Sequence, residues 1–416
     1  MKTFFILFAC FLTILVFTEA ESNIFCIHGK WAHYRKGDGH FGVAQIDPFL
    51  CTHLIYTFFG IDSEANIFSR DVWLDLEENY GLGNINKLIK LKEVNSELKI
   101  LAAIGGWFEG SKAFSDIADN ANLRKRFVKN SLHFLQRYNF DGMYLDWQHP
   151  GHREGSRPTD REAFTLLVRD LAHALHPKHY ILAALVAPEQ YTAESAYKIP
   201  RLSKYLDFVI LKTFDMHGFW GEKIGNNSPL YAKAWEENQE LLQNINAGVF
   251  YWLERGTPSQ QLIVGVAAYG RGFKMLADGN VPGSPHSGPS NPGPYTNDSG
   301  ILGFNELCEK RLTENWQDFW DEEQKVPFST REDQWIGYDN EESLRIKARF
   351  VKSFKLGGLL LNSIETDDFK GFCGRGIFPL LNAIIAALNE TSVDSAQGDR
   401  KVCVNVMETS GNHLPN

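Results

Sequence analysis

Short, almost continuously apolar segments recur along the chain, separated by longer segments in which apolar residues repeat with helical spacing. Their lack of polar alternation is typical of strands buried on both faces. The eight apolar segments occupy residues 22–31, 52–60, 99–106, 140–147, 180–187, 207–214, 261–270 and 357–364. Helical spacing between them covers residues 84–97, 123–138, 161–176 and 234–256.

This alternation of strands and helices predicts an α/β fold, a (β/α)₈ TIM barrel. An open doubly wound parallel sheet is the alternative. The interval between the seventh and eighth strands is too long for one loop and helix. It contains a segment rich in Gly, Pro, Ser and Asn at 284–303 and two short strands around a turn at 325–340.

The predicted domains follow from these intervals. Residues 21–270 and 354–388 form the barrel, and residues 271–353 form a small α+β insertion domain between strands 7 and 8. Residues 389–416 lack periodicity and are expected to be a flexible tail.

Composition and charge exclude some partners. The 416 residues carry a net charge of −9 without any block of Lys or Arg, which argues against nucleic acid as a partner. Aromatic residues make up 13% of the chain, enough to fill a core and still supply rings that stack on sugars.

The amino-terminal end has the pattern of a signal peptide, predicted at residues 1–20. Lys2 precedes an apolar run at 4–17, and Thr18-Glu19-Ala20 has the small residues of a cleavage site. No later apolar segment is long enough to span a membrane. We therefore expect a secreted, extracellular protein.

In a secreted protein, cysteines are expected to form disulfides and sequons can be glycosylated. After loss of the signal peptide, five cysteines remain, which should form disulfides and leave one over. Spacing alone does not select the pairs, and Cys403 in the polar tail is the expected odd one. Sequons begin at Asn226, Asn297 and Asn389. No pair among His28, His33 and His149 has metal-ligand spacing with carboxylates on a common face, so no metal site is expected. No cofactor is expected either.

Polar residues follow one strand closely in FDGMYLDWQHPG, residues 140–151. Side chains of a strand alternate between faces, so Tyr144, Asp146 and Gln148 share one face. At the carboxyl end of a barrel strand this face would point into the mouth, where barrel enzymes place their chemistry. Taken alone, the row is better explained by a buried Asp with hydrogen-bonded neighbours.

The segment resembles the signature D-G-x-D-x-D-x-E of glycoside hydrolase family 18, the chitinases. Other segments resemble further parts of the family in the right order. They are CIHGKWAHYRKGDG with LCTHLIYTFFG for the first two strands, KILAAIGGW for the third, DFVILKTFDMHGFW for the sixth, GVAAYGRGF for the seventh, QKVPFSTREDQWIGYDNEESLRIKARF for the insertion and GGLLLNSIETDDFKG for the eighth. The resemblance implies disulfides Cys26–Cys51 and Cys308–Cys373.

The resemblance also implies a substrate-assisted mechanism, in which a Glu protonates the glycosidic oxygen and the substrate's N-acetyl group attacks the anomeric carbon. In this chain the position of the acid is Gln148, and an amide does not titrate. The two family residues that orient the acetamido group are replaced here by Tyr144 and Phe214. The Met of the sixth strand is replaced by Lys212, and the Trp under the central sugar is replaced by Asn362. Family-type hydrolysis is therefore predicted to be absent.

Asp141, Asp146 and Asp215 match the family pattern. The degenerate row Asp141, Tyr144, Asp146 and Gln148 is assigned no catalytic residue. The following residues are predicted to line a carbohydrate groove: Trp31, Phe58, Gly106, Trp107, Gln148, His149, Lys212, Phe214, Asp215, Trp220, Tyr269, Arg271 and Asn362.

The leading hypothesis is a monomeric, secreted chitinase-like pseudoenzyme that acts by binding. Its partners would be N-acetylglucosamine oligomers or a glycoprotein or other cell-surface receptor, as for a lectin or a growth-factor or immune-modulating protein. The alternative is a weakly active glycosidase of altered specificity that uses Asp146 and Asp215. A third hypothesis is a secreted protein whose groove has no role.

Overall fold

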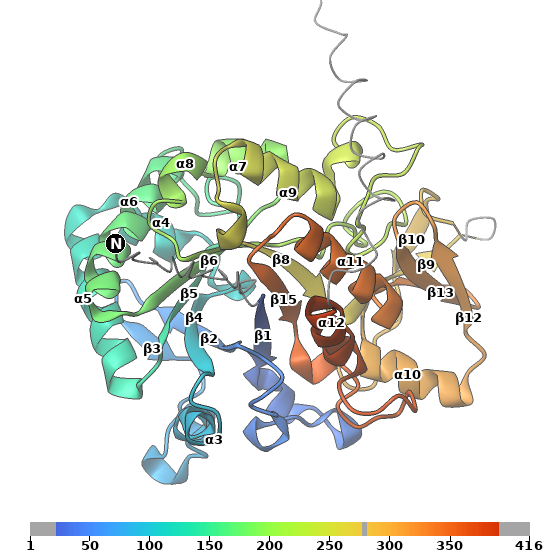
Figure 1. The fold of residues 1–416 in the computed structure, drawn as a ribbon, viewed down its shortest axis with the longest axis horizontal. Coiled ribbons are helices and arrows are strands. Elements are labelled where there is room, and N and C mark those ends of the chain that lie inside the picture. Colours follow the sequence, from blue (N-terminus) through green and yellow to red (C-terminus); the bar gives the residue numbers. More distant parts are fainter. Residues whose placement is uncertain (1–21, 277–280, 391–416) are drawn as a thin grey trace, which may run out of the picture.

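The computed structural model describes residues 22–276 and 281–390. Eight parallel strands close into a barrel (Figure 1). In chain order they are β1 (Asn23–Gly29), β2 (His53–Ile61), β4 (Lys99–Gly105), β5 (Gly142–Asp146), β6 (Ile181–Val186), β7 (Phe208–Leu211), β8 (Leu262–Ala267) and β15 (Gly358–Asn362). Because β1 pairs with both β2 and β15, the predicted TIM barrel is confirmed and the open sheet is excluded. The short strand β3 (Ile67–Ser69) pairs antiparallel with β2.

Helices surround the barrel on its outside (Figure 1). The longer ones are α4 (Lys112–Asp119), α5 (Ala121–Tyr138), α6 (Asp160–Leu175), α9 (Ile245–Glu254), α11 (Glu341–Ser353) and α12 (Pro379–Asn389). The shorter ones are α1 (Val72–Asp75), α2 (Asn84–Ile89), α3 (Leu91–Val94), α7 (Gln190–Ala196) and α8 (Ile199–Leu202).

Two of the predicted helices are wrong in extent. The segment 84–97 forms the two short helices α2 and α3, and the segment 234–256 is helical in α9 only from Ile245 onward, after one short 3₁₀ turn at Glu240–Leu242. Asn244 explains the later start, because its side-chain oxygen accepts the backbone N–H of Ala247 at 2.9 Å and caps α9.

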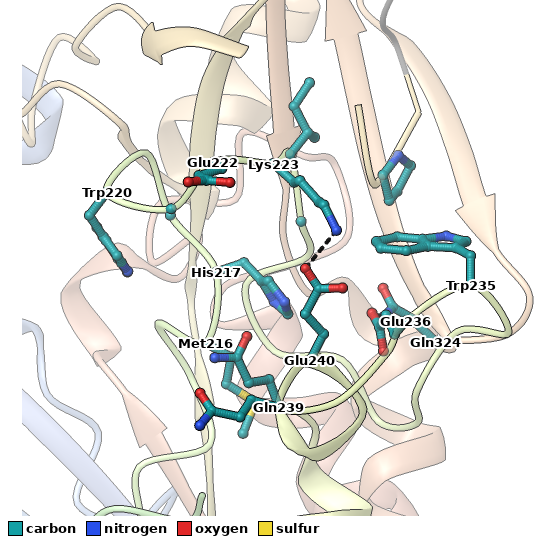
Figure 2. Close-up of a pocket in the computed structure, with 16 residues that line it drawn as sticks. Met216, His217, Trp220, Glu222, Lys223, Trp235, Glu236, Gln239, Glu240 and Gln324 are labelled. Carbon is teal, nitrogen blue, oxygen red and sulfur yellow. Dashed lines mark hydrogen bonds and ion pairs between the residues drawn. The ribbon is translucent and has the colours of Figure 1, made fainter. Parts of the chain in front are cut away.

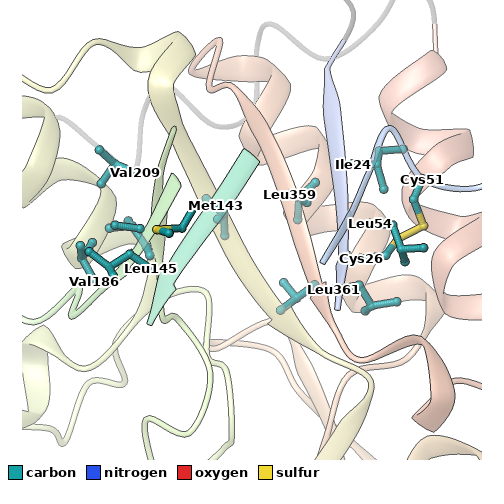
Figure 3. Close-up of a cluster of buried hydrophobic side chains, with 14 of the residues drawn as sticks. Ile24, Cys26, Cys51, Leu54, Met143, Leu145, Val186, Val209, Leu359 and Leu361 are labelled. Carbon is teal, nitrogen blue, oxygen red and sulfur yellow. A yellow bond between two sulfur atoms is a disulfide. The ribbon is translucent and has the colours of Figure 1, made fainter. Parts of the chain in front are cut away.

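The alternating faces of the strands build two apolar layers. Met143 and Leu145 of β5 point outward into the layer between strands and helices, as do Leu359 and Leu361 of β15 (Figure 3). Tyr144 points the other way, into a separate cluster that fills the barrel interior. The predicted alternation along β5 is therefore confirmed.

The segment between β8 and β15 contains a second, antiparallel sheet, seen beside the barrel in Figure 1. It consists of β9 (Tyr269–Met275), β10 (His286–Pro289), β11 (Ile301–Gly303), β12 (Gln317–Asp321), β13 (Val326–Arg331) and β14 (Gln334–Gly337), with helix α10 (Phe304–Thr313). The order is β10-β9-β14-β13-β12, and β11 pairs with β9. The predicted hairpin within 325–340 corresponds to β13 and β14.

Two disulfides connect distant parts of the chain. Cys26 in β1 is joined to Cys51 just before β2, and Cys308 in α10 is joined to Cys373 after β15. Both pairings implied by the family resemblance are confirmed. The predicted signal peptide, Cys403 and nearly all of the predicted tail lie outside the described residues. Within residues 22–276 and 281–390, no helix is long and apolar enough to cross a membrane.

Candidate functional site

Tyr144 occupies the middle of β5 and is completely buried in the barrel interior. It belongs to the same apolar cluster as Ala103, Ala183 and Phe214 from three other strands or their ends. Its hydroxyl has no hydrogen-bond partner within the described chain, and burial raises its pKa well above the ordinary value. A neutral phenol therefore fills the barrel under its mouth.

Asp146 ends β5 and is only 2% exposed. Burial raises the pKa of its carboxyl to about 6, although a hydrogen bond with Gln148 and the charges of Lys212 and Arg153 oppose the rise. Its Oδ1 and the Oε1 of Gln148 are both buried and without a partner in the described chain. The position of the expected acid thus holds an amide next to a carboxyl that is shielded from solvent.

Asp141 lies at the opposite end of β5 and has a structural role. Its carboxylate accepts hydrogen bonds from the ammonium of Lys92 at 3.0 Å and from the backbone N–H of Ile100 at 2.8 Å. It therefore connects α3 and β4 to the start of β5. The sequence placed Asp141 and Asp146 in one row, and the structure separates them by the length of the strand.

Asp215 follows β7 and is the centre of an ion-pair network. Its Oδ1 accepts the hydroxyl of Tyr269 at 2.8 Å and the Nε of Arg271 at 2.7 Å, and its Oδ2 lies 3.1 Å from the Nζ of Lys212. Burial disfavours the charged carboxylate, but the two cations and these hydrogen bonds outweigh it and lower its pKa to about 2. The structure therefore brings together four predicted groove residues, counting Lys212.

The three tryptophans that were predicted to line the groove have exposed rings. The exposed fractions are 45% for Trp31, 54% for Trp107 and 56% for Trp220. Trp31 stacks on Phe58 with ring centroids 6.1 Å apart. Gly106 has a φ of 89°, and a Cβ at this position would come within 2.9 Å of the Phe58 ring. Glycine is thus required where the chain passes this ring.

The central residues offer less to a ligand than the rim. Phe214 is buried and its ring lies 5.1 Å from the Nζ of Lys212, so it presents no stacking face. Asn362 is half-buried at the end of β15. Burial, together with Lys212 and Arg153, lowers the pKa of His149 to about 4, so its imidazole is neutral at ordinary pH.

Arg153 in the loop after β5 was missed by the sequence analysis. Its guanidinium lies 3.9 Å from the centre of the Trp107 ring, and its Nη2 donates to the Trp107 carbonyl at 2.8 Å. Its Nη1 is buried and without a partner in the described chain. Glu189 after β6 was also missed, and burial raises the pKa of its carboxyl. No spacing pattern marks Arg153, whereas a Glu at the carboxyl end of a barrel strand could have been noticed.

A cavity of about 380 Å³, lined in part by Trp220, lies between the loop after β7 and the insertion domain (Figure 2). Lys223 and Glu240 form an ion pair of 2.7 Å at its edge. Burial raises the pKa of Glu236 in its wall to about 7. Trp235 forms another part of the wall. Helical spacing in the sequence predicted a helix over 234–244, so the sequence gave no indication of this cavity.

One predicted glycosylation site is contradicted by the structure. Asn226 is 1% exposed, and its Nδ2 donates to Gln324 at 2.7 Å and to Asp321 at 3.2 Å. A glycan on Nδ2 would displace both partners and has no space in the folded domain. The side chains of Asn297 and Asn389 are exposed and leave room for a glycan.

Residues 23–367 match the sequence profile of the glycosyl hydrolases family 18. The chain belongs to this family.

Relatives in family 18 include both chitinases and a pseudo-chitinase. Chitotriosidase-1 of Mus musculus is 36% identical over 387 residues, which cover 90% of this chain and 80% of that protein. The crystal structure of Ostrinia furnacalis Group IV chitinase in complex with allosamidin has a TM-score of 0.85 at 40% identity, covering 88% of this chain and 99% of the other. Human YKL-39, described as a pseudo-chitinase with retained chitooligosaccharide binding properties, has a TM-score of 0.82 at 31% identity, covering 89% and 100%.

Compared with the family 18 signature, the differences in this chain converge in space. Tyr144 and Phe214 belong to one buried cluster although they are far apart in the sequence. Gln148 hydrogen-bonds the neighbouring Asp146, and Lys212 acts on the same carboxyl through its charge. Four of the positions that differ, Tyr144, Gln148, Lys212 and Phe214, are therefore linked to one another around the end of β5 and the barrel interior.

Proposed function

We propose that this chain is a secreted, chitinase-like pseudoenzyme that binds chito-oligosaccharides in the groove at the barrel mouth without hydrolysing them. The observation that carries the proposal is the amide of Gln148 at the position of the family's acid, with a buried phenol, Tyr144, two residues before Asp146. An amide delivers no proton at any useful pH. Loss of a general acid alone typically costs about 10²–10⁴-fold in rate.

Retained binding is supported by the rim of the groove. Trp31, Trp107 and Trp220 keep exposed rings, which can stack on the apolar faces of sugars. YKL-39, a relative of similar fold, is described as a pseudo-chitinase that retains chitooligosaccharide binding. The two disulfides fit an oxidising compartment, in agreement with secretion. We propose a monomer in solution, and a receptor as an additional partner is part of the same hypothesis.

A weak glycosidase is the second candidate, because the pKa of Asp146 near 6 would let this carboxyl hold a proton near neutral pH. Two observations weigh against it. Asp146 is almost fully buried, so it contacts no ligand without a rearrangement. Asp215, the proposed second group, has a pKa of about 2 and is paired with two cations, so it cannot act as an acid.

Isothermal titration calorimetry with chitotetraose tests the proposal. We expect binding by the wild type, at least tenfold weaker binding after Trp31→Ala or Trp107→Ala, and unchanged binding after Trp320→Ala. Trp320 is a matched control because it is an exposed tryptophan on β12, the last strand of the insertion sheet. Absence of binding by the wild type would refute the proposal. Turnover of chitotetraose that disappears in Asp146→Ala would establish the second candidate instead.

A further inference from the structure

The cavity between the loop after β7 and the insertion domain has no role in the proposed function. Of the residues that were predicted to line the groove, only Trp220 belongs to its wall. Its volume of about 380 Å³ falls within the range of small-molecule sites, about 300–1,000 Å³. The side chains of Trp220 and Trp235 are both part of the wall and both exposed (Figure 2). The cavity is therefore accessible from solvent and large enough for a small ligand.

His217 offers a hydrogen-bond acceptor to this cavity. Its Nδ1 lies 2.9 Å from the backbone oxygen of Asn226, and because a carbonyl oxygen only accepts, Nδ1 carries the proton. Burial lowers the pKa of the imidazole, so the ring is neutral at neutral pH and its Nε2 is an acceptor. No residue in 22–276 or 281–390 donates to this Nε2. A Cβ at Gly225 would come within 2.5 Å of the ring, so the ring packs closely against the backbone there.

Lys223 and Glu240 place free donors and a free acceptor side by side. The Nζ of Lys223 lies 2.7 Å from the Oε1 of Glu240 and 5.3 Å from the centre of the Trp235 ring. The ion pair uses one of the three ammonium N–H groups and one of the two carboxylate oxygens. The side chains are 45% and 36% exposed, so a ligand can reach their remaining polar atoms. These atoms are held in a preorganised arrangement by the pair itself.

Other polar groups of the wall are already used by the fold. Glu236 is buried, and its two oxygens accept the backbone N–H of Lys233 at 2.9 Å and the side-chain amide of Gln324 at 2.8 Å. The Oε1 of Gln324 accepts the amide of Asn226 at 2.7 Å. These groups build the wall and leave the recognition of a ligand to His217, Lys223 and Glu240.

The mixture of free donors and acceptors selects the class of ligand. An ammonium group would satisfy only the Nε2 of His217 and the Oε2 of Glu240, and an anion would satisfy only Lys223. A hydroxyl group both donates and accepts, so a ligand with several hydroxyls can satisfy all three residues. The apolar C–H face of a sugar ring also packs on an indole ring. The free polar groups and the two tryptophans together therefore fit a neutral pyranose.

We propose that this cavity is a second carbohydrate site, separate from the groove, which holds one neutral pyranose unit through His217, Lys223 and Glu240. The inference goes beyond the proposed function, because it does not require an oligosaccharide in the groove. An acidic sugar is disfavoured, since Glu222 at the same cavity adds a second exposed carboxylate to that of Glu240.

The experiment measures saturation transfer by NMR from the full chain to methyl β-glucopyranoside, titrated to a dissociation constant. We expect the wild type to bind this probe and Glu240→Gln to bind it about tenfold more weakly, because a charged acceptor is lost. The variant His217→Phe keeps a planar ring without the acceptor nitrogen and should bind about fivefold more weakly. Glu162→Gln should bind as the wild type does. It is a matched control, because Glu162 is a partly exposed, ion-paired glutamate on α6.

The outcomes distinguish this site from the groove and from a cation site. Saturating chitotetraose should not displace the glucopyranoside, and displacement would place the probe in the groove and overturn the inference. No saturation transfer with the wild type, or equal affinity in wild type, Glu240→Gln and His217→Phe, would overturn it as well. Tighter binding of cyclohexylamine than of the glucopyranoside would show a cation site instead.

The near-ultraviolet circular dichroism spectrum of each variant checks its fold independently of any sugar. Should His217→Phe not fold, Glu240→Gln still decides, because Glu240 lies at the edge of the cavity and its side chain is exposed. Failure of the wild type to bind chitotetraose would overturn the proposed function. Binding of the glucopyranoside that weakens in Glu240→Gln would support the second site in that case too.

Discussion

Replacing Asp146 by Asn should stabilise the protein at neutral pH although it removes a residue of the family signature. The folded-state pKa of Asp146 is about 6, against 3.8 for an ordinary Asp, because the carboxyl is buried and forms no ion pair with a cation in the described part of the chain. A difference of about two pKa units corresponds to about 3 kcal/mol. Since the folded pKa is the higher one, this contribution to stability is present below about pH 4 and is lost as the pH rises through 6.

The assay is urea denaturation with the disulfides intact, followed by tryptophan fluorescence between pH 4 and 8. Asp146→Asn does not titrate, so its free energy of unfolding should match that of the wild type near pH 4 and exceed it by up to about 3 kcal/mol at pH 7.5. A difference that is flat across this range, or that favours the wild type at pH 7.5, would refute the reasoning.

Asp215→Asn is the matched control with the opposite sign. The carboxyl of Asp215 has its pKa lowered to about 2 by Lys212, Arg271 and its hydrogen bonds, which outweigh burial. Its contribution to stability is present above pH 4 and is lost only as the pH falls through 2. This variant should therefore be less stable than the wild type by about 2 kcal/mol at pH 7.5.

Three further predictions concern other parts of the molecule. The variant Gln148→Glu alone should not release products from chitotetraose, because Tyr144 still fills the barrel under the mouth. Measurable turnover would show that Tyr144 does not block hydrolysis. Replacing Cys26 and Cys51 by Ser opens a connection of 25 residues and should lower the free energy of unfolding by about 3 kcal/mol, seen as a lower urea midpoint. Asn226→Gln should leave the glycan mass of the secreted protein unchanged in mass spectrometry, and loss of one glycan would contradict its burial.

The barrel was predictable because closure into a cylinder buries each strand on both faces, which leaves continuous apolar runs in the sequence. The disulfide pairs followed from the family resemblance. The extent of the helix at 234–256 was not predictable from periodicity alone, because the decisive event is the cap at Asn244, a short-range hydrogen bond within an otherwise regular pattern. Helical spacing continues across this cap, so the helix was predicted to begin too early. The residues wrongly assigned to it include part of the wall of the cavity in Figure 2.

Site residues that match a motif could be predicted from the sequence. Site residues whose role depends on a contact with a distant part of the chain could not. Gln148 and Lys212 were found from their positions in segments that resemble the family. Arg153 was not, because its role depends on a contact with Trp107 from another strand's loop. Asn226 is the opposite case, in which a motif match predicts a site that the fold does not expose. It lies in a complete sequon, but its side chain is buried and hydrogen-bonds Gln324.

The most direct test of the central claim is a time course of native mass spectrometry on the protein with chitotetraose. This measurement records the complex and any reaction products together. We predict a complex with one intact tetrasaccharide that persists for hours without shorter sugars. Accumulation of disaccharide by the purified wild type, or a spectrum without any complex, would contradict the claim that the groove binds and does not hydrolyse.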